Sequence, residues 1–134
     1  MAEINGTSAS ETLTGTNGDD IINGLGGNDT LQGSFGNNTL NGGIGLDNLS
    51  GGDGDDTFLQ LDFQGFAEIF AGGSGFDTLE MRSIGSLSSF NISSIEKFRF
   101  APPANLTGMQ VSIHLIQVAS QITTLEGSGA RDQF

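Results

Sequence analysis

Residues 6–59 repeat with a period of nine residues, without an insertion or a deletion. Each of these six nonapeptides begins with Gly, has an acidic residue or Asn at position six, and has a large apolar residue at position eight. The position-six residues are Glu11, Asp20, Asp29, Asn38, Asp47 and Asp56, and the position-eight residues are Leu13, Ile22, Leu31, Leu40, Leu49 and Phe58. Such a period indicates that each repeat is one structural unit, which buries its apolar face only by stacking on its neighbours.

Within each nonapeptide, turn-forming residues are followed by a three-residue strand. Gly, Asn, Asp and Ser dominate positions one to six, where Gly tolerates positive φ and Asn and Asp bond to nearby backbone. Segments such as 30–32 place one apolar residue between two polar ones, which is typical of a half-buried strand. One strand every nine residues gives a full coil every eighteen. The sequence therefore predicts an all-β fold, a right-handed parallel β-roll (a β-helix or solenoid), with two short sheets facing each other across the position-eight side chains.

The register breaks after Leu59, where residues 60–62 look like an insertion. Residues 63–71 then form a degenerate repeat with Glu68 at position six and Phe70 at position eight. A regular unit returns directly afterwards and places Asp77 at position six.

From residue 81 the nonapeptide pattern is lost. Segments 96–100, 111–115 and 122–125 alternate polar and apolar residues, and we interpret them as less regular rungs of the same parallel stack. The sequence thus predicts two parts, the repeats at 1–80 and an irregular β-rich capping segment at 81–134. The last eight residues, GSGARDQF, look like a partial repeat, which leads us to expect further repeats or domains in a larger parent protein.

The negative charge of the chain is concentrated in its repeats. The net charge is −12, and residues 1–81 hold thirteen of the sixteen acidic residues and no Lys or Arg. Nucleic acid is thereby excluded as a partner, because phosphate contacts need a basic surface, and the acidic part repels itself unless cations neutralise it. The absence of Cys excludes disulfides and thiol chemistry. No Sec-type signal follows Met1, and no apolar run approaches the roughly 18 residues of a membrane span.

The nonapeptides resemble the RTX family of calcium-binding repeats, whose unit is G-G-x-G-x-D-x-U-x with U a large apolar residue. The units GGDGDDTFL (51–59) and GGSGFDTLE (72–80) match it at every defined position. The resemblance covers residues 6–80. It implies that Ca²⁺ ions lie between stacked turns and take position-six carboxylates and turn carbonyls from both.

The residue chemistry independently favours calcium. Hydrophobic residues are only 35% of the chain, and one buried apolar side chain per nonapeptide does not offset the entropy lost in ordering nine backbone units. Carboxylates and backbone carbonyls in a flexible loop suit Ca²⁺, whereas Mg²⁺ needs strict octahedral geometry. A zinc site is not favoured, because the chain has no Cys and His114 is its single His.

The eighteen-residue coil predicts which turns stack on one another. One edge of the roll carries Glu11, Asp29, Asp47 and Glu68, and the other carries Asp20, Asn38, Asp56 and Asp77. Carried over position by position, the resemblance places the best ion site between Asp29 and Asp47, followed by Glu11–Asp29 and Asp56–Asp77. The neutral Asn38 departs from the family pattern and should weaken its neighbouring sites. Seven turn glycines complete the implied ligand set, namely Gly26, Gly43, Gly45, Gly52, Gly54, Gly73 and Gly75. Asp19, Asp53 and Asp55 are interpreted as solvated or secondary ligands.

These observations predict a non-enzymatic module that binds several Ca²⁺ ions and folds on binding them outside the cell. The resemblance implies type I export as part of a secreted bacterial protein. The sequence has no G-x-S-x-G, H-E-x-x-H or Walker motif, so no catalytic residue is predicted. Two alternatives stay open. In the first, the chain is an adhesin or polysaccharide-binding module, in which Arg82, Lys97 and Arg99 form a basic face. In the second, it is the C-terminal tail of a secreted hydrolase or epimerase.

Overall fold

The computed structural model describes residues 1–61, 68–82, 91–100 and 124–127. They form two parallel β-sheets, and the part of the chain described contains no helix. The first sheet has the order β1 (Ala2–Asn5), β3 (Asp20–Asn23), β5 (Thr39–Asn41), β7 (Thr57–Gln60), β9 (Thr78–Met81), β11 (Lys97–Phe100) and β12 (Thr124–Gly127). The second has the order β2 (Thr12–Thr14), β4 (Thr30–Phe35), β6 (Asn48–Asp53), β8 (Ile69–Ser74) and β10 (Asn91–Ser93). A search of these ranges for a helix long and apolar enough to cross a membrane finds none.

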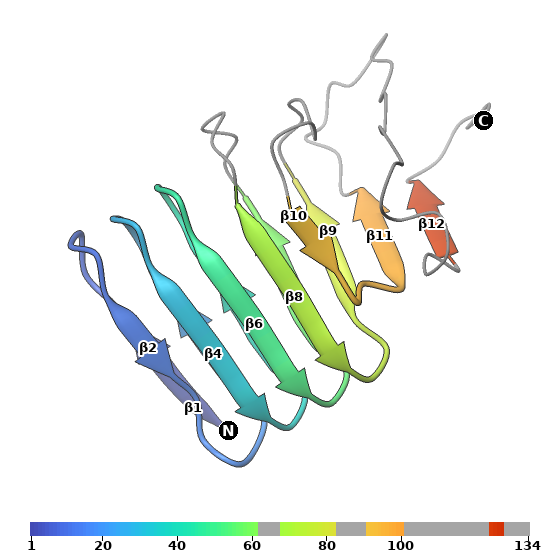
Figure 1. Ribbon diagram of the computed structural model, residues 1–134, viewed down its shortest axis with the longest axis horizontal. Coiled ribbons are helices and arrows are strands. Elements are labelled where there is room, and N and C mark those ends of the chain that lie inside the picture. Colours follow the sequence, from blue (N-terminus) through green and yellow to red (C-terminus); the bar gives the residue numbers. More distant parts are fainter. Residues whose placement is uncertain (62–67, 83–90, 101–123, 128–134) are drawn as a thin grey trace, which may run out of the picture.

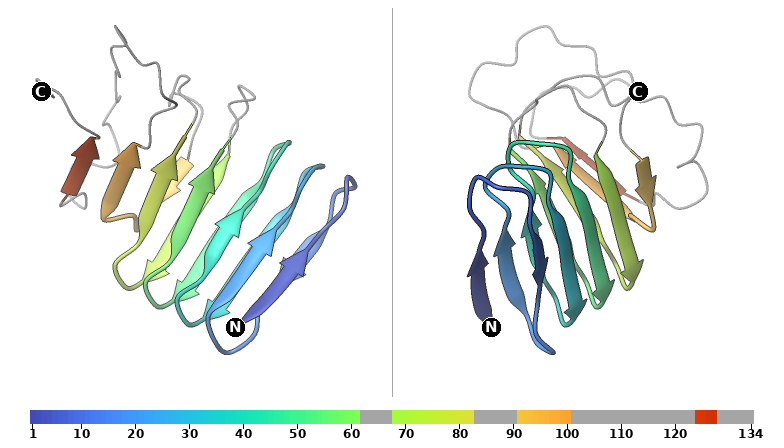
Figure 2. Two further views of the ribbon diagram at one scale, coloured as in Figure 1. Left: turned by 180° about the vertical axis from the view of Figure 1, so that it is seen from behind. Right: turned by 60° about the vertical axis from the view of Figure 1, so that its left-hand side comes forward.

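The chain alternates between the two sheets, so that each strand pairs with the strand one coil later (Figures 1 and 2). Position eight always pairs with position eight, as in Ile22 with Leu40 and Leu31 with Leu49. These residues are eighteen apart, which is the predicted length of a coil. The parallel β-roll predicted from the nonapeptide period is confirmed.

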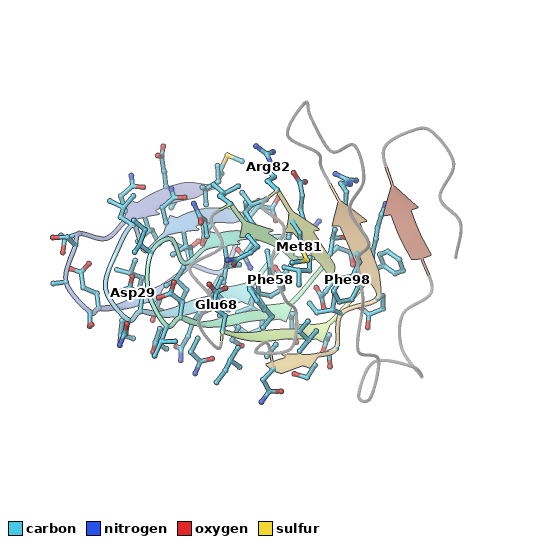
Figure 3. The ribbon with its side chains drawn as sticks, turned by 90° about the horizontal axis from the view of Figure 1, so that it is seen from above. Asp29, Phe58, Glu68, Met81, Arg82 and Phe98 are labelled. Atoms are coloured by element: carbon cyan, nitrogen blue, oxygen red, sulfur yellow. The ribbon has the colours of Figure 1, made fainter. Side chains whose placement is uncertain are left out.

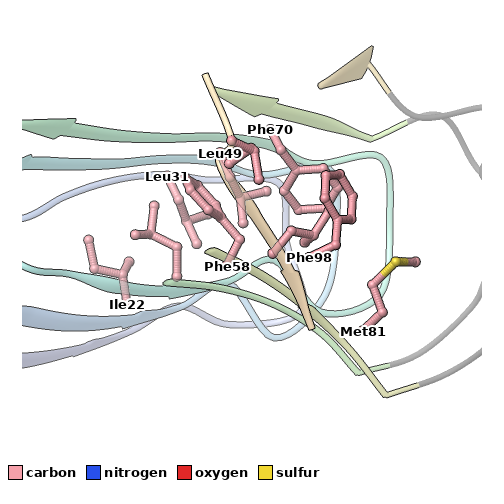
Figure 4. Packing of buried hydrophobic residues seen from close by; sticks show 10 residues of the cluster. Ile22, Leu31, Leu49, Phe58, Phe70, Met81 and Phe98 are labelled. Carbon is pink, nitrogen blue, oxygen red and sulfur yellow. The ribbon is translucent and has the colours of Figure 1, made fainter. Parts of the chain in front are cut away.

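Position-eight side chains fill the space between the sheets. Ile22, Leu40, Phe58, Leu79 and Phe98 come from the first sheet and Leu31, Leu49 and Phe70 from the second, and all are at most 1% exposed (Figure 4). The rings of Phe58 and Phe70 meet edge to face, with centroids 5.9 Å apart and an interplanar angle of 81°. This geometry is favourable for aromatic pairs. The core therefore consists mainly of the position-eight residues of the two sheets, and Met81 and Ile95 extend it at the C-terminal end of the repeats.

Three extra residues between β7 and β8 leave the stack in register. β6 pairs with β8 through Leu49 and Phe70, which are twenty-one residues apart instead of eighteen. The predicted insertion and the predicted place of Phe70 at position eight are both confirmed. Residues 62–67 lie outside the described ranges.

The first sheet continues after residue 81, where the nonapeptide pattern disappears. β11 pairs with β9 through Phe98 and Leu79, and β12 pairs with β11 through Leu125 and Phe98. Two of the three predicted rungs are thus present, while 111–115 and the terminal partial repeat beyond Gly127 lie outside the described ranges. Ile92, which pairs with Phe70, lies six residues before Phe98, whereas Phe70 lies nine residues before Leu79 in the previous coil. Because this step is shorter than nine residues, the nonapeptide period does not identify the strand.

The second sheet has longer strands than the sequence predicts. β4, β6 and β8 each have six residues, so they run through positions one to three, which were expected to be turn. The pairing of Ser34 with Gly52 and of Gly52 with Gly73 continues the ladder into these positions. Because successive coils repeat the same backbone there, their N–H and C=O groups face each other and pair.

Candidate metal centre

The turns lie along two opposite edges of the roll (Figure 1). The first edge consists of the turns 6–11, 24–29 and 42–47 together with Glu68, and the second edge consists of the turns 15–20, 33–38, 51–56 and 72–77 together with Glu96. In Figure 3, which looks onto the first edge, Asp29 and Glu68 lie between the two sheets. The predicted assignment of the position-six residues to the two edges is confirmed.

One side-chain oxygen at each position six accepts the backbone N–H of position six in the preceding coil. On the second edge this ladder runs from Ala2 to Asp20 (2.7 Å), Asp20 to Asn38 (3.0 Å), Asn38 to Asp56 (2.8 Å), Asp56 to Asp77 (2.8 Å) and Asp77 to Glu96 (2.8 Å). On the first edge, Glu11 N donates to Asp29 and Asp29 N to Asp47, both at 2.8 Å. Asn38 serves as well as Asp, so the ladder needs an oxygen but no charge. The turn of Asp77 stacks in register despite the insertion.

The second carboxylate oxygen separates the turns into two groups. In Asp29, Asp47, Asp56 and Asp77 the atom Oδ2 is buried and has no hydrogen-bond partner. These residues are at most 2% exposed. A buried ionised oxygen without a partner is strongly unfavourable. We call the turns of these four residues (24–29, 42–47, 51–56 and 72–77) the open turns.

In the other three turns the protein itself supplies a partner for the corresponding atom. Asp20 Oδ2 accepts the N–H of Thr16 at 2.5 Å and its hydroxyl at 2.8 Å. Glu11 Oε2 accepts the N–H of Thr7 at 2.5 Å. In Asn38 the place of this oxygen is taken by Nδ2, which donates to Gly36 O at 3.0 Å. We call the turns 6–11, 15–20 and 33–38 the closed turns.

The pKa values of the carboxyl groups follow this division. Burial raises the pKa of Asp29, Asp47 and Asp56 above the ordinary value, and it raises the pKa of Asp77 to about 6. The pKa of Asp20 is instead lowered, chiefly by the N–H of Thr16. In the open turns the single hydrogen bond of the ladder thus does not offset the cost of burying the carboxylate charge.

Glu68 is a further buried acid on the first edge. Its Oε1 accepts Gln60 Nε2 at 3.1 Å. Burial raises the pKa of Glu68 to about 7, the hydrogen bond from Gln60 acts in the opposite direction, and the charge of Asp47 raises the pKa further. Glu68 therefore adds to the excess of acidic groups at the end of this edge.

Glycine at position one leaves room for the unpartnered Oδ2 atoms of the open turns. A Cβ atom on Gly24 would lie 2.5 Å from Asp29 Oδ2, and a Cβ atom on Gly51 would collide with Asp56 Oδ2. At position two, Gly52 has a φ of 110° and lies against the carbonyl oxygen of Ser34 in the preceding coil. The stacked turns therefore bring backbone carbonyl oxygens as well as carboxylates together.

The donor set of the open turns suits a hard cation held partly by the backbone. The described ranges contain no group of three or more His, Cys, Asp or Glu side chains placed to hold one metal ion. A cation in an open turn would therefore need backbone carbonyls in addition to carboxylates. All of these ligands are oxygen atoms in a flexible loop, which is the coordination that Ca²⁺ prefers.

A second ladder at position five was not predicted from the sequence. Asn37 N donates to Asp19 Oδ1 (2.7 Å), Asp55 N to Asn37 Oδ1 (2.9 Å) and Phe76 N to Asp55 Oδ1 (2.8 Å). Asp19 and Asp55, interpreted above as solvated or secondary ligands, thus also support the stacking. The recurrence of Asp and Asn at position five was the available signal. The role of Thr7 and Thr16 was also missed, and its signal is the replacement of the second Gly of the repeat by Thr.

The comparison with family models agrees with the geometry. Residues 5–40 and 23–58 match the family model of the RTX calcium-binding nonapeptide repeat, with four copies. No curated protein matches the chain. The solution structure of the AlgE6R3 subunit from the Azotobacter vinelandii mannuronan C5-epimerase is 35% identical, with a TM-score of 0.39, over 65% of this chain and 46% of that chain. The present chain thus spans less than half the length of that subunit.

Proposed function

We propose that this chain is a calcium-binding module that folds when Ca²⁺ is bound in its open turns, and the match of residues 5–58 to the family model of the RTX calcium-binding nonapeptide repeat supports this proposal. The observation that carries the proposal is the set of four buried Oδ2 atoms without a partner. An orphaned buried oxygen needs a ligand outside the protein, and four at equivalent positions need the same one.

Asp29 and Asp47 hold calcium on the first edge, and Asp56 and Asp77 hold it on the second. Each aspartate keeps Oδ1 in the ladder and offers Oδ2, while backbone carbonyls of the stacked turns supply the remaining ligands. A bound Ca²⁺ ion supplies positive charge and several coordination positions for oxygen.

Binding is coupled to folding because the metal-free roll is poorly supported. Most strands place only one apolar side chain in the core, and the chain carries a net charge of −12. Four unpartnered carboxylate oxygens oppose burial in addition. A preformed site is absent from the unfolded chain, so the binding free energy becomes folding free energy.

The setting that fits such a module is outside a bacterial cell. Extracellular calcium modules have dissociation constants of about 10⁻⁴–10⁻³ M, so the chain would remain unfolded at the low calcium concentration of the cytosol and fold after export. We assign the chain no catalytic role, and we place it in a larger protein exported by a type I system.

A second candidate function, binding of an acidic polysaccharide, is favoured by the outer face of the first sheet. Arg82 Nε lies 2.8 Å from Glu80 Oε1, and Arg99 Nη1 lies 3.5 Å from Glu80 Oε2. Their side chains are 56% and 47% exposed. Lys97 lies two residues before Arg99 in β11. Arg82 points away from the core in Figure 3. This face gathers three of the four basic residues of the chain.

The test of the main proposal is a calcium titration of the full chain, followed by circular dichroism and by amide NMR spectra. We expect little β-structure in chelator, cooperative folding near millimolar calcium, and poor replacement by magnesium. Unchanged spectra between chelator and calcium would reject the proposal. A glycan array with the calcium-loaded chain tests the second candidate, and Arg99→Ala should reduce any binding of acidic glycans without changing the calcium titration.

A further inference from the structure

We infer, on the basis of the proposed function, that the residues at positions two and six together select the turns that take an ion. Thr7 and Thr16 close their turns with their own donors, and Asn38 closes its turn with its own amide. The chain therefore holds calcium in its four open turns and leaves its three closed turns free of metal, although Glu11, Asp20 and Asn38 all occupy position six.

Thr16 donates to the carboxylate oxygen of Asp20 that an ion would bind. Asp20 Oδ1 accepts Ala2 N, and Asp20 Oδ2 accepts both donors of Thr16. Both oxygens of Asp20 are thus satisfied by protein groups. An ion entering this turn would have to replace charge-assisted hydrogen bonds that already stabilise the carboxylate.

The backbone at position two explains why the open turns lack this bond. Leu25, Gly43, Gly52 and Gly73, which occupy position two of the open turns, have φ angles of 75°, 92°, 110° and 111°, whereas Thr7 and Thr16 do not have positive φ. Positive φ is unfavourable for a β-branched residue. Thr thereby keeps position two in the conformation whose N–H reaches the carboxylate. Gly, and Leu at position 25, adopt the positive-φ conformation of the open turns.

Asn38 closes its turn in a different way. Ser34 at position two has a φ of 80°, so the backbone resembles that of the open turns. Asp20 N donates to Asn38 Oδ1 at 3.0 Å, and this bond holds Oδ1 in the ladder. Nδ2 then faces the turn and donates to Gly36 O at 3.0 Å. A cation would meet an N–H group here instead of an anionic oxygen.

The closed turns are grouped at one end of the roll. On the first edge Glu11 precedes Asp29 and Asp47, and on the second edge Asp20 and Asn38 precede Asp56 and Asp77. The N-terminal coil therefore stacks through protein hydrogen bonds alone, and calcium is confined to the coils that follow.

The loss experiment compares Asp20→Asn with Asp56→Asn in the full chain. Both changes keep an oxygen for the ladder and remove one charge on the same edge, and Asn38 shows that this edge accepts Asn. Calorimetry and equilibrium dialysis then give the affinity and the number of ions per chain. We expect Asp56→Asn to lose an ion or to weaken binding about tenfold or more, because calcium affinity follows the ligand charge count, and Asp20→Asn to leave the number of bound ions per chain unchanged.

The gain experiment opens the closed turns. Asn38→Asp should add binding on the second edge. In that background Thr16→Gly gives the turn GGNGDD, close to GGDGDD at 51–56, and should add a further ion, whereas Thr16→Val, which keeps the β-branch, should not. Circular dichroism at saturating calcium shows whether each variant is folded.

Equal losses in Asp20→Asn and Asp56→Asn, or no gain in the opened variants, would overturn the inference and leave the proposed function standing. Wild-type chain that binds no calcium, or binding unaffected by Asp56→Asn, would instead reject the proposed function itself.

Discussion

Two turns on the second edge, 15–20 and 51–56, have nearly the same sequence but satisfy their carboxylates differently. They read GTNGDD and GGDGDD and differ only at positions two and three. Both Asp20 and Asp56 enter the same ladder with Oδ1. Asp20 Oδ2 receives both donors of Thr16, while Asp56 Oδ2 receives none. The comparison teaches that a side-chain oxygen at position six builds the stack, and that a neighbouring residue decides whether the carboxylate also needs an ion.

The largest expected effect is that of Asp47→Ala, because it removes both functions of the side chain. The change deletes the unpartnered Oδ2 and also the acceptor for Asp29 N. We expect the calcium concentration at the folding midpoint to rise about tenfold or more. The buried N–H of Asp29 adds a cost of about 1–3 kcal/mol. Asp47→Asn should show only the first effect, and Glu11→Ala, in a closed turn at the end of the stack, should shift the midpoint least. Similar midpoints for Asp47→Ala and Glu11→Ala would remove the distinction between open and closed turns.

Deletion of residues 81–134 should come next in size. Ile95 and Phe98 are buried against the end of the roll, and terminal units of a repeat stack normally cover its core. Residues 1–80 should keep the four open turns but fold with lower cooperativity at saturating calcium. A titration of this fragment by circular dichroism measures this. Cooperative folding identical to that of the full chain would show that the later segment has a different function.

A smaller effect is expected from glycine substitutions on the second edge. Gly51→Ala places a Cβ atom against Asp56 Oδ2 and the carbonyl oxygen of Gly72, whereas a Cβ atom on Gly18 has no atom within 4 Å. Gly51→Ala should cost about 1–3 kcal/mol of folding free energy and weaken calcium binding, and Gly18→Ala should be nearly neutral. Chemical denaturation in calcium measures both. Equal stabilities would mean that the oxygen of Asp56 has room to move aside.

The smallest expected effect is the pH dependence of the calcium-free chain. The pKa values of Glu68 and Asp77 are raised to about 7 and about 6 in the folded chain, above the roughly 4 of unfolded carboxyls. The folded chain therefore binds more protons, and its stability increases as the pH falls from 8 through these values towards 4. Chelated protein should show more β-structure at pH 5 than at pH 8. Loss of structure on this acidification would contradict the assigned burial of the open carboxylates.

The nine-residue period was sufficient to predict the coil, the core and the stacking of position six. Parallel strands one coil apart stack in only one register that keeps Ile22, Leu40 and Phe58 inside. The regular spacing of one apolar residue was therefore enough to predict most of the fold.

The same period could not distinguish open turns from closed ones. Thr16 and Gly52 both read as turn residues, and their difference lies in the sign of φ and the direction of one N–H. The period also does not identify Phe98 as a core position, because the step from Ile92 to Phe98 is three residues shorter than nine while the strand still pairs in register. Local backbone conformation and loop length decide these points, and neither alters the pattern of residue types.

Anomalous diffraction from crystals of the full chain grown in calcium tests the central claim most directly. The account predicts calcium peaks beside Asp29, Asp47, Asp56 and Asp77, and none within the turns of Glu11, Asp20 and Asn38. Peaks of equal height in the turns of Asp20 and Asp56, or no peak beside any open turn, would contradict it.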